Sequence, residues 1–185
     1  VQAAEQGDRL LPEELFTTTI LLLGAGHETT MNLIGNGLVA LLRHPDQLAA
    51  LRADPRLARS AVEELLRYDS PVQLTARITT EPQTIGGVDI GEGEEVVVVS
   101  AAANRDPARF CDPDRLDIRR PQNTHLSFGG GAHFCLGAAL ARLEGEVTFG
   151  RLAQRFAGIE LLEEPAWRPS ATLRGLTSLR VNVTR

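Results

Sequence analysis

The sequence of 185 residues contains no lysine, only two cysteines and no long run of apolar residues. Without lysine it cannot form the usual phosphate-binding loop, in which Lys-Ser or Lys-Thr follows a run of glycines. No apolar run approaches the length that crosses a bilayer, and no segment has the pattern of a secretory signal. The two cysteines could form one disulfide, but in a reducing compartment a metal-binding or packing role is favoured. Together these features indicate a cytoplasmic location.

The overall composition is that of a globular protein, with 43% hydrophobic residues and a formal net charge of -5. The negative charge argues against nucleic acid as the main partner. No internal repeat or low-complexity linker divides the chain, which is long enough for one core or for part of a larger one. The first residue is Val1, and the opening resembles the approach to an internal helix. We therefore expect a fragment that lacks an N-terminal part.

The most informative stretch is a glycine-rich loop that ends in a cysteine, at residues 128–137. Its three consecutive glycines allow positive φ angles, and the periodicity of residues 136–156 predicts an amphipathic helix directly after it. Cys135 would then lie at a helix N-terminus, where the positive end of the dipole favours a thiolate, the form that binds a metal. Gly137 leaves room for a flat group beside the turn. On its own, the same pattern also fits a plain turn with a buried cysteine.

A second unusual stretch lies within a long predicted helix over residues 12–43. Its middle reads Ala25-Gly26-His27-Glu28-Thr29-Thr30. A helical glycine costs about 1 kcal/mol relative to alanine, and threonine hydroxyls can bond back to carbonyls one turn earlier. Such a weak point suggests that something lies close to the backbone, although a surface Glu beside a Thr would read the same way.

The pair Gly24-x-Gly26 also imitates the start of a dinucleotide-binding fingerprint, with Asp46 about twenty residues downstream. Thr29 stands where the third glycine belongs, and no turn separates a strand from a helix. We therefore reject this interpretation.

The remaining chain reads as helices, then short strands. Glu64-x-x-Arg67 places an acid and a base on one helix face, a pattern that is usually solvated. From residue 72 to residue 100 the period changes and predicts one small sheet, with a Gly-Gly hairpin at residues 84–90. We expect helices over 45–53, 57–68 and 136–156, and terminal strands over 158–163 and 174–183.

These motifs, in this order, resemble the cytochrome P450 family. The loop matches Phe-x-x-Gly-x-x-x-Cys-x-Gly and continues as Leu136-Gly137-Ala138-Ala139-Leu140-Ala141-Arg142. A loop-rich segment called the meander, which contains Ala103-Asn104-Arg105-Asp106-Pro107 and the turn at residues 112–114, also matches the family. The resemblance covers nearly the whole chain. It implies a mainly α fold with small β-sheets (α+β), present as its C-terminal portion: residues 1–185 would form a single, partial cytochrome P450 domain.

The resemblance also implies the site. Cys135 thiolate would be the axial ligand of the iron of haem b, Arg77 and His133 would bind its propionates, and Glu28 and Thr29 would deliver protons to dioxygen. A guanidinium and an imidazolium both suit a carboxylate. The other residues expected to contact the cofactor are Phe128, Ala25, Gly26, Leu136, Gly137 and Ala141.

A structural triad is implied as well, in which Glu64 and Arg67 are buried and joined by Arg115 to hold the meander. Residues 71–74 and 173–176 match segments that border the substrate. Cys111 belongs to no motif, and we interpret it as a packing or incidental residue.

The implied function is haem-thiolate monooxygenation, in which one oxygen atom of O2 enters a small, largely apolar organic substrate. Electrons would come from a ferredoxin-type donor, since the chain has no flavin or nicotinamide motif, and neither a membrane nor nucleic acid is expected as a partner. Two alternatives stay open. One is a peroxide-using haem-thiolate peroxygenase, and the other is a truncated, catalytically incompetent haem-binding fragment.

Overall fold

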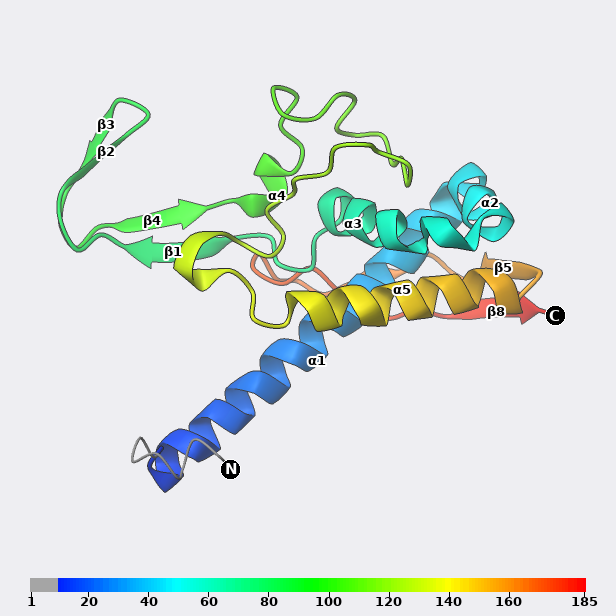
Figure 1. The fold of residues 1–185 in the computed structure, drawn as a ribbon, viewed down its shortest axis with the longest axis horizontal. Helices are drawn as coiled ribbons and strands as arrows, with labels where there is room; N and C mark the ends of the chain where they lie inside the picture. Colours follow the sequence, from blue (N-terminus) through cyan, green and yellow to red (C-terminus); the bar gives the residue numbers. More distant parts are fainter. Residues whose placement is uncertain (1–9) are drawn as a thin grey trace.

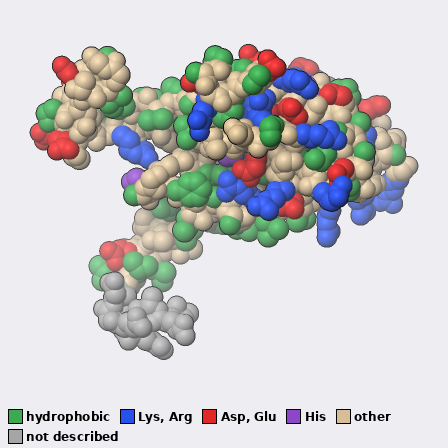
Figure 2. Space-filling model, turned by 45° about the horizontal axis from the view of Figure 1, so that its top comes forward, with side chains coloured by type: hydrophobic (Ala, Val, Ile, Leu, Met, Phe, Trp, Pro, Cys, Tyr) green, Lys and Arg blue, Asp and Glu red, His purple; other side chains and the backbone are tan. Residues whose placement is uncertain are grey.

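The computed structural model describes residues 10–185 (Figure 1). The suggested approach to an internal helix, before Leu10, lies outside these residues. Two parts project from a compact body: the first half of the long helix α1 and a hairpin of two short strands. On the face shown in Figure 2, arginine and acidic side chains are interspersed over this body.

Helix α1 spans Pro12–Arg43, as predicted, and is helical without interruption through both glycines at its centre. Its proline lies in the first turn, and Glu14 accepts a hydrogen bond from the backbone N–H of Leu11 at 2.8 Å. The second half is buried in the body, whereas apolar side chains of the first half are exposed, among them Leu21, Leu22 and Leu23. Even so, within residues 10–185 no helix has both the length and the hydropathy required to cross a bilayer.

The core lies where the second half of α1 meets helices α3 (Ala58–Tyr68) and α5 (Ala138–Arg155). Contact is close enough that a Cβ on Gly37 of α1 would lie 2.5 Å from Cζ of Phe149 on α5 and 3.0 Å from Cδ1 of Leu65 on α3. The predicted helices are confirmed, with ends shifted by one or two residues: α2 is Pro45–Ala53, a 3₁₀ turn η2 is Pro55–Leu57, α3 is Ala58–Tyr68 and α5 is Ala138–Arg155.

The prediction of one small sheet over residues 72–100 is wrong, because the structure has two separate two-stranded sheets. Pro82 has no N–H to donate, and Gly93, at φ 80°, turns the chain, so the ladders cannot continue into one another. The Gly-Gly hairpin is confirmed. The antiparallel pairs are β1 (Thr75–Ile78) with β4 (Glu95–Val98) and β2 (Gln83–Ile85) with β3 (Val88–Ile90), and the chain then enters helix α4 (Ser100–Ala103).

The strand predicted over residues 174–183 is divided in two, because its halves pair with different partners. β7 (Leu176–Ser178) pairs with β6 (Ala166–Trp167), and β8 (Val181–Thr184) pairs with β5 (Gly158–Leu161). We refer to residues 166–178, which contain β6 and β7, as the β6–β7 hairpin.

Both cysteines are free and exposed. Of the two interpretations of Cys111, its exposure excludes packing and leaves an incidental residue, and no disulfide joins it to Cys135.

Candidate functional site

The cysteine loop is closed by its own backbone. The N–H of Cys135 donates to the carbonyl of Phe128 at 2.9 Å. Gly129 and Gly131 have φ angles of 69° and 64°, which other residues rarely adopt. Gly130 is extended, so two of the three glycines are required by conformation.

The thiol lies just before the first turn of α5, which begins two residues later than predicted. The carbonyl of Cys135 accepts from the N–H of Ala138 at 3.2 Å. A Cβ on Gly137 would meet only Sγ of Cys135, at 4.0 Å. The thiol is exposed, and so are the apolar side chains beside it, since Phe134 is 52% and Leu136 89% exposed. An accessible thiol with apolar neighbours and open space over Gly137 fits an iron porphyrin, whose flat face is apolar and whose iron takes a thiolate ligand.

Behind the loop, Arg142 of α5 joins the loop to α3. Its guanidinium lies 4.5 Å from the ring centre of Phe128, and its Nε donates to Glu63 at 2.6 Å. Hydrogen bonds with Glu63 raise the pKa of Arg142, and the nearby charge of Cys135 acts in the same direction. His125 lies 3.0 Å from the other oxygen of Glu63. The sequence analysis missed this network. The one feature of the sequence that could have indicated it is Arg142, which lies two helical turns after the cysteine.

Glu63 should make the stability of the fold depend on pH. Burial raises its pKa, but hydrogen bonds from His125 and Arg142 outweigh burial and lower the pKa from 4.5 to about 2. A lowered pKa stabilises the fold above about pH 4.5, and this contribution is lost as the pH falls towards 2. Because the side chain is 23% exposed, we take about 3 kcal/mol as the upper limit of the contribution.

We expect Glu63→Gln to lower the free energy of unfolding at pH 7, and the difference from the parent protein to shrink as the pH falls below 4.5. Urea unfolding at a series of pH values measures this. Glu160→Gln, on an exposed strand position, is the matched control and should leave the profile unchanged. A difference between Glu63→Gln and the parent that stays constant from pH 7 to pH 3 would contradict the assignment.

Glu64 and Arg67 form a fully buried ion pair on α3. Two hydrogen bonds of 2.8 and 2.9 Å connect them, and both side chains have 0% exposure. Arg67 also donates to the carbonyls of Asn104, Pro113 and Arg115. The pair therefore ties α3 to the meander, the irregular segment that follows α4.

The expectation that Arg115 completes this triad is wrong. Its side chain is exposed, and only its backbone carbonyl reaches the network. Arg120 takes the position instead, with Nε 3.1 Å from Glu64 and a side chain that is 9% exposed. The meander turns at Asp112, which has a positive φ of 46°. Beyond this turn, Arg120 contacts Glu64 of α3, whereas the side chain of Arg115 is exposed.

Glu28 and Thr29 lie at the point where α1 enters the body. The hydroxyl of Thr29 donates to the carbonyl of Ala25 at 2.7 Å, as the sequence suggested. Oε1 of Glu28 accepts from Arg168 of the β6–β7 hairpin at 2.8 Å, a partner that the sequence analysis missed. A Cβ on Gly26 would meet nothing within 4 Å, so this side of the helix leaves space for a ligand.

Arg77 and His133 are both exposed, Arg77 on β1 and His133 in the 3₁₀ turn before Cys135. Arg77 donates to the neighbouring carbonyl of Ala76 at 2.7 Å. Within residues 10–185, neither Arg77 nor His133 is in an ion pair, so each side chain can bind a carboxylate.

The two segments expected to border the substrate pair with each other. Val72 and Leu173 form an antiparallel bridge, and the N–H of Arg174 donates to the carbonyl of Pro71 at 2.8 Å. Arg174 also binds Asp69, whose pKa is raised by burial although Arg174 opposes this.

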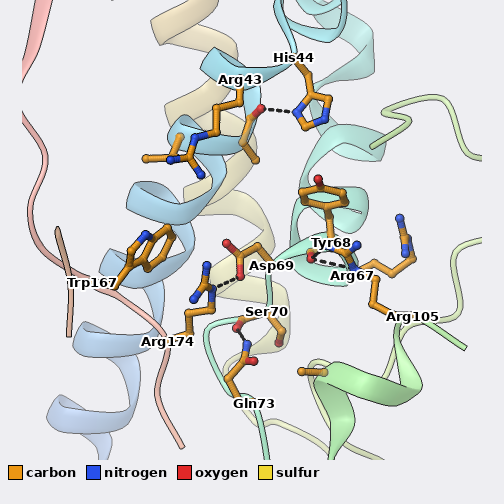
Figure 3. A pocket seen from close by; sticks show the side chains of 13 residues that line it. Arg43, His44, Arg67, Tyr68, Asp69, Ser70, Gln73, Arg105, Trp167 and Arg174 are labelled. Carbon is orange, nitrogen blue, oxygen red and sulfur yellow. Dashed lines mark hydrogen bonds and ion pairs between the residues drawn. The ribbon is translucent and has the colours of Figure 1, made fainter. Parts of the chain in front are cut away.

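Figure 3 shows Arg174 between Asp69 and Trp167 at a cavity of about 380 Å³ with many polar side chains. None of the residues expected to bind the cofactor lines this cavity.

A sequence model of the cytochrome P450 family matches residues 1–172. Cytochrome P450 107B1 of Saccharopolyspora erythraea is 54% identical over 185 residues, which are 98% of this chain and 46% of that protein. The cytochrome P450 monooxygenase PikC of Streptomyces venezuelae is 50% identical over 98% of this chain and 44% of its own length. The crystal structure of P450BioI, bound to an acyl carrier protein ligated to hexadec-9Z-enoic acid, superposes with a TM-score of 0.93 at 50% identity, over 96% of this chain and 47% of that one.

Cytochrome P450 proteins form a haem-thiolate class, in which a cysteine thiolate binds the haem iron. The chain belongs to the cytochrome P450 family. It spans less than half the length of the curated relatives named above.

Proposed function

We propose that the protein carrying this chain is a haem-thiolate monooxygenase that inserts one oxygen atom of O2 into a small, largely apolar organic molecule. The second oxygen atom leaves as water, with two electrons and two protons consumed. The observation that carries the proposal is the exposed Cys135 thiol in its closed loop, flanked by exposed apolar side chains. Cys135 would hold haem b through its thiolate, and the bound haem would supply the activation of dioxygen.

The residues around the loop would hold this group. Arg77 and His133 supply cations for the two propionates, and Arg77 can offer a guanidinium fork. Phe128, Leu136 and Ala141 contribute apolar surface on the cysteine side, while Ala25 and Gly26 of α1 would face the opposite side. Gly137 would let the flat group approach the turn.

Glu28 and Thr29 would move protons. In the structure the Thr29 hydroxyl donates its hydrogen bond to the carbonyl of Ala25, so the hydroxyl oxygen can accept a hydrogen bond from a water. Glu28 is partly exposed, with 43% of its side chain accessible, and can therefore exchange protons with solvent. Thr29 would hold a water molecule, and the neighbouring Glu28 carboxylate would return a proton to that water from solvent. The two side chains would together form a short proton path.

Thr29→Ala should uncouple electron use from product formation. We expect a several-fold fall in product per dioxygen consumed, with the balance appearing as hydrogen peroxide, because general acid catalysis of this kind contributes roughly 10²-fold or more. Thr19→Ala is a closely matched control, since Thr19 makes the same 2.7 Å back-bond to Leu15 on the same helix. Equal coupling in both variants would refute the role of Thr29.

Electrons would come from a ferredoxin-type donor in the cytoplasm. The same coupling assay, run with hydrogen peroxide in place of donor and dioxygen, separates this function from that of a peroxygenase. Faster turnover with peroxide alone would favour the peroxygenase.

The apolar substrate class is consistent with one solved relative, which was crystallised with an acyl carrier protein ligated to hexadec-9Z-enoic acid. It also agrees with the apolar character of residues such as Val72 and Leu173 in the two paired segments.

A second candidate is a haem-binding fragment that turns nothing over. The exposed apolar side chains along the first half of α1 favour it, because such a surface normally packs against other protein. Turnover by the 185-residue chain itself, with donor and substrate present, would exclude this candidate.

A further inference from the structure

Three polar side chains of α1 lie on one stripe of the helix that faces the β6–β7 hairpin. They are Glu28, Asn32 and Asn36, spaced four residues apart, so they project from the same face on successive turns. Asn32 is 4% and Asn36 1% exposed. A buried amide is costly unless it is hydrogen-bonded. Nδ2 of Asn36 is bonded, whereas Nδ2 of Asn32 has no hydrogen-bond partner within residues 10–185, so Asn32 contributes a close packing contact.

The two asparagines fix the position of the chain just before β7. A Cβ on Gly175 would lie 2.0 Å from Oδ1 of Asn32, so the amide packs directly against a backbone that only glycine allows. One turn later, Nδ2 of Asn36 donates to the carbonyl of Arg174 at 3.0 Å. The hairpin therefore cannot shift along α1 without breaking these contacts.

Arg168 makes the third contact between the β6–β7 hairpin and α1. It binds Glu28, the acid expected to deliver protons. Its Nε donates to the carbonyl of Leu176 at 3.1 Å, and its NH1 donates to Oε1 of Glu28 at 2.8 Å. Its backbone N–H donates to Gly175 at 2.9 Å. One guanidinium thus bridges the β7 backbone and the carboxylate, in a fixed planar geometry.

The β6–β7 hairpin contains one of the two segments expected beside the substrate, residues 173–176, and it is hydrogen-bonded to the other, residues 71–74. Its outer turn pairs with residues 71–73 through the Val72–Leu173 bridge and a 2.9 Å bond from the N–H of Gln73 to the carbonyl of Thr172. A continuous set of hydrogen bonds therefore runs from Glu28 through Arg168 to both segments.

We propose that Arg168 is a positioning residue that holds the Glu28 carboxylate against the β6–β7 hairpin and so fixes where the proton path begins. A free glutamate side chain samples several rotamers, and the contact with Arg168 selects one of them. Oε1 is held by the guanidinium, while Oε2 has no hydrogen-bond partner within residues 10–185 and stays available to a water. This inference rests on the proposed function of Glu28.

The test uses the haem-loaded protein with Arg168→Gln, Arg168→Lys, Glu28→Gln and the double variant Glu28→Gln/Arg168→Gln. Arg180→Gln is the control, since Arg180 forms a comparable but more exposed ion pair with Glu163. We expect Arg168→Gln to lower product per dioxygen by roughly threefold to tenfold, which is less than the roughly 100-fold that a 1 Å misplacement of a catalytic group can cost, because Glu28 itself stays in place on α1. Arg168→Lys should recover most of the loss, and Arg168→Gln should add nothing in the Glu28→Gln background.

Hydrogen exchange at residues 166–178 provides a readout that is independent of turnover. Glu28→Gln should speed exchange of these amides by about two- to fivefold, although Glu28 precedes Arg168 by 140 residues, because it removes one anchor of the hairpin. Unchanged exchange, or coupling losses that simply add in the double variant, would overturn the role of Arg168. Faster exchange with full coupling in Glu28→Gln would instead support the anchor and overturn the proton role of Glu28.

Discussion

Arg67→Ala is expected to destabilise the fold by about 3 to 5 kcal/mol and to abolish haem retention in the protein that carries this chain. Glu64 would lose its closest ion-pair partner at a site with no solvent contact, and three backbone carbonyls of the meander would lose their donor. Because the meander leads into the cysteine loop, its release should loosen the loop as well. Thermal unfolding gives the stability, and the ratio of Soret to protein absorbance on purification gives the haem content.

The matched variants are Arg120→Ala and Arg115→Ala. Arg120 binds Glu64 and the carbonyls of Cys111 and Arg115, so its loss should also destabilise the protein, but by less, since Arg67 still neutralises Glu64. Arg115→Ala should change the unfolding free energy by less than about 0.5 kcal/mol, as is usual for exposed side chains. Normal haem content in Arg67→Ala, or a larger loss in Arg115→Ala than in Arg120→Ala, would contradict this arrangement.

The helices were predictable because their signals are local. Pro12 in a first turn, the His44-Pro45 break and the run of apolar positions between them define α1 without reference to the rest of the chain. The cysteine loop was equally predictable, because a run of glycines allows the positive φ angles that Gly129 and Gly131 adopt. Strand pairing is not local. The division of residues 174–183 into β7 and β8 depends on β5 and β6, which precede it by several residues and take separate partners.

The ionic contacts show the same limit more sharply. Arg115 and Arg120 both follow the meander turn at Asp112. Which of them contacts Glu64 depends on the path of the backbone beyond that turn. Arg168 and Arg142 meet Glu28 and Glu63 across distances in sequence that no spacing rule covers. The sequence singled out Glu28 and Glu64 but not Glu63, and the three-dimensional arrangement decided which of the nineteen basic residues contact these acids.

Cys135→Ser is expected to have the largest effect on the site and little effect on the fold. The side chain is exposed, and the loop is closed by the backbone N–H of residue 135, which serine retains. Serine removes the thiolate, and with it the ligand that gives haem-thiolate proteins their electronic character. Cys111→Ser is a close control, because Cys111 is the other exposed free cysteine of the chain.

The most direct measurement is the absorption spectrum of the haem-loaded protein after reduction and exposure to carbon monoxide, for the parent, Cys135→Ser and Cys111→Ser. We expect a red-shifted, thiolate-type Soret band in the parent and in Cys111→Ser, and its absence in Cys135→Ser. A thiolate-type band that persists in Cys135→Ser would show that Cys135 is not the ligand of the iron.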